Sequence, residues 1–143
     1  MNKEYNTMKR DIGDLIDRWS IAKLKSERIG EEENKKEYSS FNIALKDVEE
    51  KNLEFYWNEF KDLLYAINSC IWTNEAGLKG GKEELVDKHY IYSDKNREAL
   101  AKIGQATIII RDFNMLRVRV KNLINTILKD GFQDIKKDHL SEK

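Results

Sequence analysis

Polar and charged side chains recur along one face of a predicted helix in residues 66–82, AINSCIWTNEAGLKGGK. Positions i, i+4, i+7 and i+11 of this face fall within roughly 60° of one another at ~100° per residue. Apolar residues usually hold such a spacing, because the stripe that they form becomes buried. Here the positions are occupied by Asn68, Trp72, Glu75 and Lys79. Side chains of these types could pair across helices or hold a polar ligand.

Two further columns of polar residues fall on other predicted helices. In residues 17–29, Asp17 and Arg28 lie eleven positions apart along one face, and Ser20 and Lys25 flank that face. In residues 114–125, polar residues occupy i, i+3, i+7 and i+11, and they are Asn114, Arg117, Lys121 and Asn125. Each column borders an apolar stripe, so we expect its side chains to lie on a helix shoulder and to be partly buried.

The charges of the three columns are unequal. The cations Lys25, Arg28, Lys79, Arg117 and Lys121 stand against the carboxylates of Asp17 and Glu75. A surplus of positive charge beside a tryptophan and amide side chains suits a small phosphorylated ligand with a ring to stack. The columns therefore predict a nucleotide or nucleotide-sugar site formed by Asp17, Lys25, Arg28, Asn68, Trp72, Glu75, Lys79, Asn114, Arg117 and Lys121.

A structural interpretation of the same residues stays open at this point. Asp17 and Arg28 could form ion pairs with other helices, and Trp72 could belong to the core. Arg117 and Lys121 could extend from buried stems toward water. The columns would then be contacts between helices or subunits of a helical interaction protein.

Sequence motifs of catalysis are missing. The chain contains no phosphate-binding loop, dinucleotide fingerprint, nucleophile elbow or Glu-x-x-Glu pair. His89 and His139 lie outside the columns, and Cys70 is the one cysteine, so no zinc-binding spacing exists. Asp17 and Glu75 are the remaining acid–base candidates, and nothing in the sequence tunes either. We therefore expect no catalytic residues, no metal and no cofactor.

The elements that must position these residues are long helices. The chain has no proline, seven glycines and 36% charged residues, a composition typical of helices. The apolar period predicts helices over 8–29, 39–78 and 94–129, with a break in the second near 51–53. The expected helix ends are Gly30, Gly77, Gly80, Gly81 and Gly131, and Ser93 or Asp94 is an expected N-cap. The β-branched run in 107–110 favours a strand by propensity, but it lies inside a helical pattern.

These patterns predict an all-α protein, an antiparallel bundle of three to four long helices. Residues 1–130 would form a single helical domain and residues 131–143 a charged C-terminal tail. Leu116, Leu123 and Ile127 are expected to face the core. Apolar residues on two sides of the helix over 94–129 predict a homodimer or larger oligomer.

Charge and hydropathy bound the possible partners. Twenty-six basic residues balance 26 acidic ones, so no nucleic acid is expected as a partner. No apolar run is long enough to cross a bilayer, so no membrane association is expected. A single cysteine fits a reducing compartment, which predicts a cytoplasmic protein.

Three segments, DLIDRWSIAKLKSERI, NSCIWTNE and NMLRVRVKNLIN, together resemble one family pattern. The family consists of small bacterial helical proteins often encoded beside lipopolysaccharide and glycosyltransferase genes, and its pattern includes Asn-x3-Trp-x2-Glu and Asn-x2-Arg-x3-Lys-x2-Ile-Asn. Matching positions are Asp17, Ser20, Lys25, Glu27, Arg28, Asn68, Trp72, Glu75, Asn114, Arg117, Lys121, Ile124 and Asn125. The chain departs from the pattern at Ala76 and Met115, where the family has Asp, and at Lys79, where Arg is usual. The resemblance implies that the three columns belong together.

Two functions follow as hypotheses. The first is non-catalytic binding of a small phosphorylated, nucleotide-like ligand between helices, which would sequester a signalling nucleotide. The second is a helical interaction protein, an accessory to cell-surface glycan biosynthesis, with no small-molecule ligand.

Overall fold

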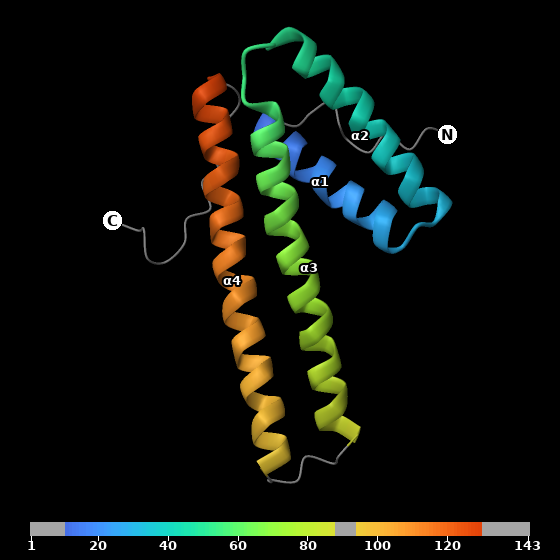
Figure 1. The fold of residues 1–143 in the computed structure, drawn as a ribbon, viewed down its shortest axis with the longest axis vertical. Helices are drawn as coiled ribbons and strands as arrows, with labels where there is room; N and C mark the ends of the chain where they lie inside the picture. The colour runs from blue at the N-terminus through green and yellow to red at the C-terminus, as the bar shows by residue number, and fades with distance from the viewer. Residues whose placement is uncertain (1–10, 88–93, 130–143) are drawn as a thin grey trace.

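Four helices make up most of the chain that the structure describes (Figure 1). A computed structural model describes residues 11–87 and 94–129, and within these residues no strand is present. The helices are α1 (Ile12–Arg28), α2 (Glu32–Lys51), α3 (Trp57–Asp87) and α4 (Asp94–Leu128). The all-α prediction is confirmed, and residues 107–110 are helical despite their β-branched side chains.

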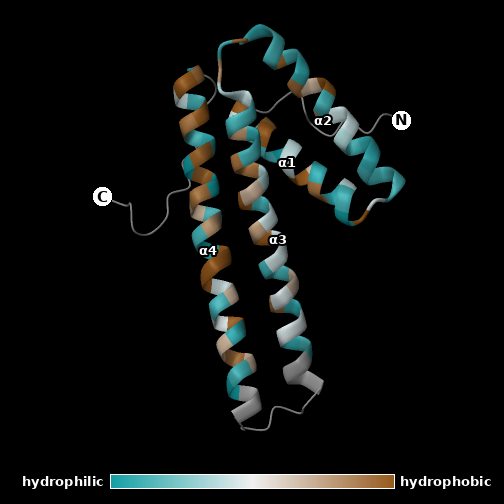
Figure 2. Ribbon diagram, viewed as in Figure 1, coloured by the Kyte–Doolittle hydropathy of each residue, from teal (hydrophilic) through white to brown (hydrophobic). Residues whose placement is uncertain are grey.

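Helices α3 and α4 form a long antiparallel hairpin that carries the other two (Figure 1). Helix α1 packs against both α3 and α4 near one end of the hairpin, and α2 packs on α1. The opposite end of the hairpin extends beyond α1 and α2. Figure 2 shows hydrophobic residues along the upper part of α4, in the half of the hairpin that α1 covers. No described helix is long and apolar enough to cross a membrane.

Local capping explains the ends of α1 and the start of α2. The Asp11 carboxylate accepts a hydrogen bond from the backbone N–H of Asp14 at 2.8 Å, which begins α1. Gly30 has a φ of 74°, so it ends the first helical segment as predicted. The prediction that the next helix begins at residue 39 is wrong, because α2 begins at Glu32. Acidic residues in its first turn favour this start through the helix dipole.

The predicted break near residues 51–53 is confirmed between α2 and α3. The indole N–H of Trp57 donates to the Asn52 carbonyl oxygen at 2.7 Å, which closes this turn. The ring of Phe55 stacks on that of Phe60, with centroids 5.3 Å apart. The turn is therefore held by hydrogen bonding and by aromatic packing.

Three glycines predicted to end a helix near residue 78 instead lie within α3, which continues to Asp87. Helix α3 continues past these glycines because it packs against α4. The Cα of Gly81 faces α4 so closely that an added Cβ would lie 3.0 Å from Ile103. Neighbouring α4 therefore supports a segment whose glycines disfavour a helix in isolation. Ser93, Gly131 and the predicted tail 131–143 lie outside the described residues.

All four helices contribute to one hydrophobic core. Its most buried members include Ile16 of α1, Leu45 of α2, Leu64 of α3 and Ile124 of α4. The prediction for one side of α4 is wrong, because Leu116, Leu123 and Ile127 are exposed by 41%, 49% and 46%. Residues Val120 and Ile124 fill the core in their place.

Candidate functional site

A buried carboxylate, Asp17 of α1, lies at the junction of α1, α3 and α4. Its side chain is fully buried. Arg117 of α4 donates from Nε to Oδ1 at 2.8 Å and from Nη2 to Oδ2 at 2.7 Å. Asn68 of α3 donates from Nδ2 to Oδ1 at 2.9 Å. One carboxylate therefore connects two predicted columns on other helices through a bidentate ion pair and an amide.

Further polar residues surround this centre. The Nδ2 of Asn68 also donates to Ser20 Oγ at 2.7 Å, and the Ser20 hydroxyl donates to the Asp17 carbonyl oxygen at 2.7 Å. Lys121 Nζ lies 3.0 Å from Asp14 Oδ1 and 4.0 Å from Asp17 Oδ2. The Nη1 of Arg117 donates to Asn114 Oδ1 at 3.4 Å. We refer to these residues as the polar cluster: Asp14, Asp17, Ser20, Asn68, Asn114, Arg117 and Lys121.

A glycine in the first turn of α1 allows this close approach of α1 to α4. A Cβ at Gly13 would collide with the backbone carbonyl oxygen of Lys121. The backbone N–H of Gly13 donates to Asn125 Oδ1 at 2.8 Å. Asn125 is itself buried, so it satisfies a donor that the start of a helix leaves without an intrahelical partner. The last member of the third column thus positions α1 on α4.

The charges of the polar cluster balance. Asp14 and Asp17 carry negative charge, and Arg117 and Lys121 carry positive charge. Burial of the Arg117 guanidinium lowers its pKa, but the hydrogen bonds and charge of Asp17 outweigh that effect. Asp14 and Glu75 add to the attraction, so the pKa of Arg117 lies above its ordinary value. The cluster is a neutral network in which each charge has a partner.

A second group of predicted residues lies at the C-terminal end of α1. Arg28 donates to Ser69 Oγ at 2.7 Å and to Thr73 Oγ1 at 3.3 Å. Its guanidinium carbon lies 5.9 Å from the ring centroid of Trp72. These contacts place Arg28 and Trp72 side by side on the surface, in a group we call the Arg28 shelf: Arg28, Ser69, Trp72 and Thr73.

The remaining predicted residues separate from these two groups. Lys25 lies 3.6 Å from Glu37 of α2, so it faces away from the polar cluster. Glu75 and Lys79 are exposed, and Glu75 acts on Arg117 only through its charge. His89 and His139 lie outside the described residues. The structure therefore brings together the following predicted residues at the cluster: Asp17, Asn68, Asn114, Arg117 and Lys121.

Sequence reasoning missed Asp14 and Gly13, although signals for both were present. Asp14 stands three residues before Asp17, so the two share a helical face. Gly13 lies in the first turn after a capping aspartate, where close contact with another backbone is one reason for a glycine. The partners of Arg28 on α3, Ser69 and Thr73, flank the predicted column of α3 and were also missed.

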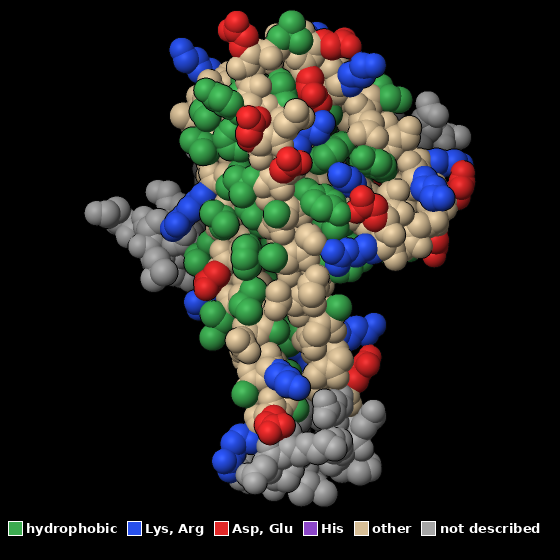
Figure 3. All heavy atoms as spheres, viewed as in Figure 1, with side chains coloured by type: hydrophobic (Ala, Val, Ile, Leu, Met, Phe, Trp, Pro, Cys, Tyr) green, Lys and Arg blue, Asp and Glu red, His purple; other side chains and the backbone are tan. Residues whose placement is uncertain are grey.

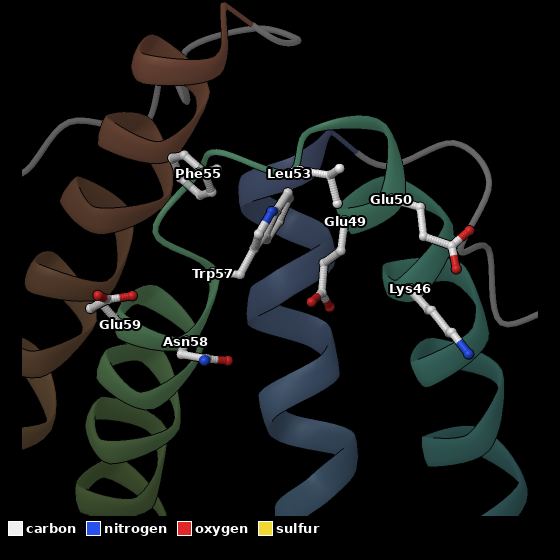
Figure 4. Close-up of a pocket in the computed structure, with 8 residues that line it drawn as sticks. All are labelled: Lys46, Glu49, Glu50, Leu53, Phe55, Trp57, Asn58 and Glu59. Atoms are coloured by element: carbon white, nitrogen blue, oxygen red, sulfur yellow. The ribbon is translucent and has the colours of Figure 1, made fainter.

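An open pocket lies away from both groups, at the turn between α2 and α3 (Figure 4). Its lining residues are Lys46, Glu49, Glu50, Leu53, Phe55, Trp57, Asn58 and Glu59, none of them a predicted site residue. Glu49 is held by Lys61, whose Nζ lies 3.3 Å from Oε2. Within residues 11–87 and 94–129, no group of three His, Cys, Asp or Glu side chains is arranged to bind a metal.

No model of a protein family, no curated protein and no solved structure matches this chain. The resemblance to the bacterial helical family therefore stays a prediction.

The Arg117→Ala substitution tests the role of the polar cluster. It would leave the buried Asp17 carboxylate without its bidentate partner, so we expect the free energy of unfolding to fall by roughly 3 kcal/mol or more. Arg111→Ala is the matched control on the same helix, because Arg111 is exposed and, among the described residues, pairs with the adjacent Asp112. This control should change stability by less than about 0.5 kcal/mol.

Chemical denaturation of both variants measures the difference. A loss below about 1 kcal/mol for Arg117→Ala would indicate an adaptable, solvated site and would contradict the structural role.

Proposed function

We propose that this protein acts without catalysis, as a helical interaction protein that binds a helical partner on its α3/α4 hairpin. The observation that carries the proposal is an apolar surface on the side of the hairpin away from α1. We call it the hairpin face and define it by Tyr56, Leu63 and Cys70 at the α3 side and by Leu116, Leu123 and Ile127 on α4.

Helical geometry places this face opposite the polar cluster. Leu63 precedes Asn68 by five residues, which turns its side chain by roughly 140° from the column that contacts α1. Leu123 follows Lys121 by two residues, a rotation of roughly 200°. The upper end of α1 lies behind the hairpin in Figure 1, and Figure 3 shows hydrophobic side chains gathered over α3 and α4 from the same viewpoint.

The spacing within the hairpin face is that of packed helices. Tyr56, Leu63 and Cys70 repeat every seven residues, and so do Leu116 and Leu123. A seven-residue apolar repeat is the pattern by which helices pack along one another at a small angle. Single exposed apolar residues are ordinary, but a contiguous group in this register indicates a contact surface.

The polar cluster supports the same proposal from the opposite side of the hairpin. Its charges are mutually paired and Asp17 is fully buried, so its residues are occupied in holding α1. Arg117 and Lys121 would have to leave these carboxylates before they could bind a phosphate. The network therefore favours the structural interpretation of the columns over a shared ligand pocket.

Replacing Leu116 and Leu123 together by lysine tests whether the hairpin face is a docking surface or a part of the core. We expect the double variant to keep the free energy of unfolding of the isolated chain within about 1 kcal/mol, because both side chains are already exposed. Ile124→Lys is the matched control, since Ile124 is fully buried one residue away. The free energy of unfolding of this control should fall by about 3 kcal/mol or more.

Denaturation at low protein concentration gives these values. A double variant as unstable as Ile124→Lys would show that the leucines belong to the core, and it would contradict the proposal.

The Arg28 shelf favours a second candidate function, binding of a small phosphorylated ligand that carries a ring. Arg28 contacts two hydroxyls and a tryptophan ring, and among the described residues it forms no salt bridge with a carboxylate. A guanidinium beside an aromatic ring suits a nucleotide or nucleotide-sugar, with the phosphate on the arginine and the ring on Trp72. This candidate uses a smaller group of residues than the sequence suggested.

A thermal-shift screen of nucleotides and nucleotide-sugars tests the second candidate. A ligand at about ten times its dissociation constant adds about 1.4 kcal/mol to the stability of the native state. We expect the resulting rise in Tm to disappear in Arg28→Gln and to persist in Lys36→Gln, an exposed control on α2. A rise that survives Arg28→Gln, or none with any compound, would rule out this site.

A further inference from the structure

We infer that the occupant of the hairpin face is a second copy of this chain, related by a two-fold axis parallel to the hairpin. In this dimer α3 of each protomer lies on α4 of its partner, and the two hairpins form a four-helix bundle. The inference rests on the proposed function, because it names the partner of the same surface.

The two sides of the hairpin face are matched in height. Asn68 and Arg117 both contact Asp17, so they mark one level of the hairpin. From that level Leu63 lies about 8 Å along the axis and Leu123 about 9 Å in the same direction, at 1.5 Å per residue. The α3 and α4 sides therefore present leucines at the same height.

The other members of the face pair in the same way. Cys70 lies about 3 Å below the Asn68 level, and Leu116 lies about 2 Å below the Arg117 level. Tyr56 lies about 18 Å above the Asn68 level, and Ile127 lies about 15 Å above the Arg117 level. Rotation about an axis parallel to the hairpin places each α3 residue against the α4 residue of the partner at its own height. The heights within each pair agree to about 3 Å, which is less than one helical turn.

Helix direction supports this arrangement. The α3 and α4 helices are antiparallel, so the rotation also sets α3 antiparallel to α4 of the partner. Every adjacent pair in the resulting bundle is then antiparallel, as in many four-helix bundles. Each helix also gains a neighbour on its second apolar side, which no helix among residues 11–87 and 94–129 covers.

Charges along the two edges of the face are complementary. Within the height of the face, the α3 edge carries Glu59 and Asp62, and the α4 edge carries Arg119. Asp112, one heptad before Arg119 on the α4 edge, lies below the face and pairs with Arg111. The two-fold rotation brings the α4 edge of one protomer alongside the α3 edge of its partner. Asp62 and Arg119 then differ in height by about 6 Å, a distance that an extended arginine side chain can span. The contact would occur twice, once at each edge of the bundle.

The size of the face is sufficient for a specific dimer. It extends for about 20 Å along the hairpin and is two helices, about 20 Å, wide. The flat footprint is about 400 Å² per protomer, and protruding side chains raise its accessible area to roughly 600 Å². The two protomers together would bury about 1,200 Å², which is the lower bound for stable interfaces. The six residues that define the face include no charged side chain, which suits a buried centre.

Sedimentation equilibrium of the full chain at tens of micromolar tests the inference. We expect the mass of a dimer for the unmodified protein, and we expect Leu123→Lys to raise the dissociation constant roughly 30-fold or more by placing a lysine in the buried centre. Ile43→Lys is the matched control, because Ile43 is an exposed apolar residue of α2 outside the face. This control should remain dimeric.

Charge reversal tests the orientation of the partner. Arg119→Glu should weaken the dimer, and adding Asp62→Arg in the same chain should restore it, because both edges then carry exchanged charges. If neither change alters the dissociation constant of the dimer, the two-fold arrangement is overturned.

The remaining outcomes separate this inference from the proposed function. A monomer mass for the unmodified protein, or a dimer that persists in Leu123→Lys, would overturn the second copy as the occupant. If the Leu116→Lys and Leu123→Lys double variant is nonetheless as stable as the unmodified chain, the docking surface stands and its partner is a different helical protein. If that double variant unfolds, both proposals fail.

Discussion

The ion pair between Asp17 and Arg117 is the contact on which the arrangement of the helices depends. Asp17 is fully buried, and both of its carboxylate oxygens are held by one guanidinium. A buried carboxylate without such a partner would be strongly destabilising. Helix α1 can therefore rest on the hairpin only in the register that brings Asp17 to Arg117 and Asn68. Because α2 packs on α1, the same contact also places α2.

The hairpin thus uses its two sides differently. One side turns amides and charges toward α1, where they satisfy one another and fix the register. The other side turns exposed leucines and an isoleucine away from α1. Polar pairing supplies specificity within the chain, and the apolar side is the surface that we propose for association. This division favours a protein that works through contacts over one that encloses a ligand.

The sequence was informative where residue type and spacing act together. Residue spacing predicted a polar column on each of three helices, and the family resemblance implied that the columns belong together. In the structure Asp17, Asn68 and Arg117 are in contact. The spacing could not show whether their charges would face a ligand or one another, because that depends on Asp14, which adds a second carboxylate. Nor did it show that Lys25 would turn to Glu37, since the position of α2 follows from packing.

Two errors about the fold arose where packing between helices decides what the local sequence pattern leaves open. Helix α4 has apolar residues on two sides, and both sides have helical period, so periodicity alone could not assign Val120 to the core and Leu123 to the surface. The glycines of α3 suggested an early helix end by local propensity. Contacts with α4 along the hairpin outweigh that propensity, as the approach of Gly81 to Ile103 illustrates.

A double-mutant cycle with Asp17→Asn and Arg117→Gln tests the central claim most directly, because it isolates the energy that the two side chains share. We expect a coupling of about 2 kcal/mol or more in the free energy of unfolding, since the pair is bidentate and its carboxylate is buried. A coupling below about 0.5 kcal/mol would show that the two residues act independently, and it would contradict the account of the polar cluster as the contact that holds α1 on the hairpin.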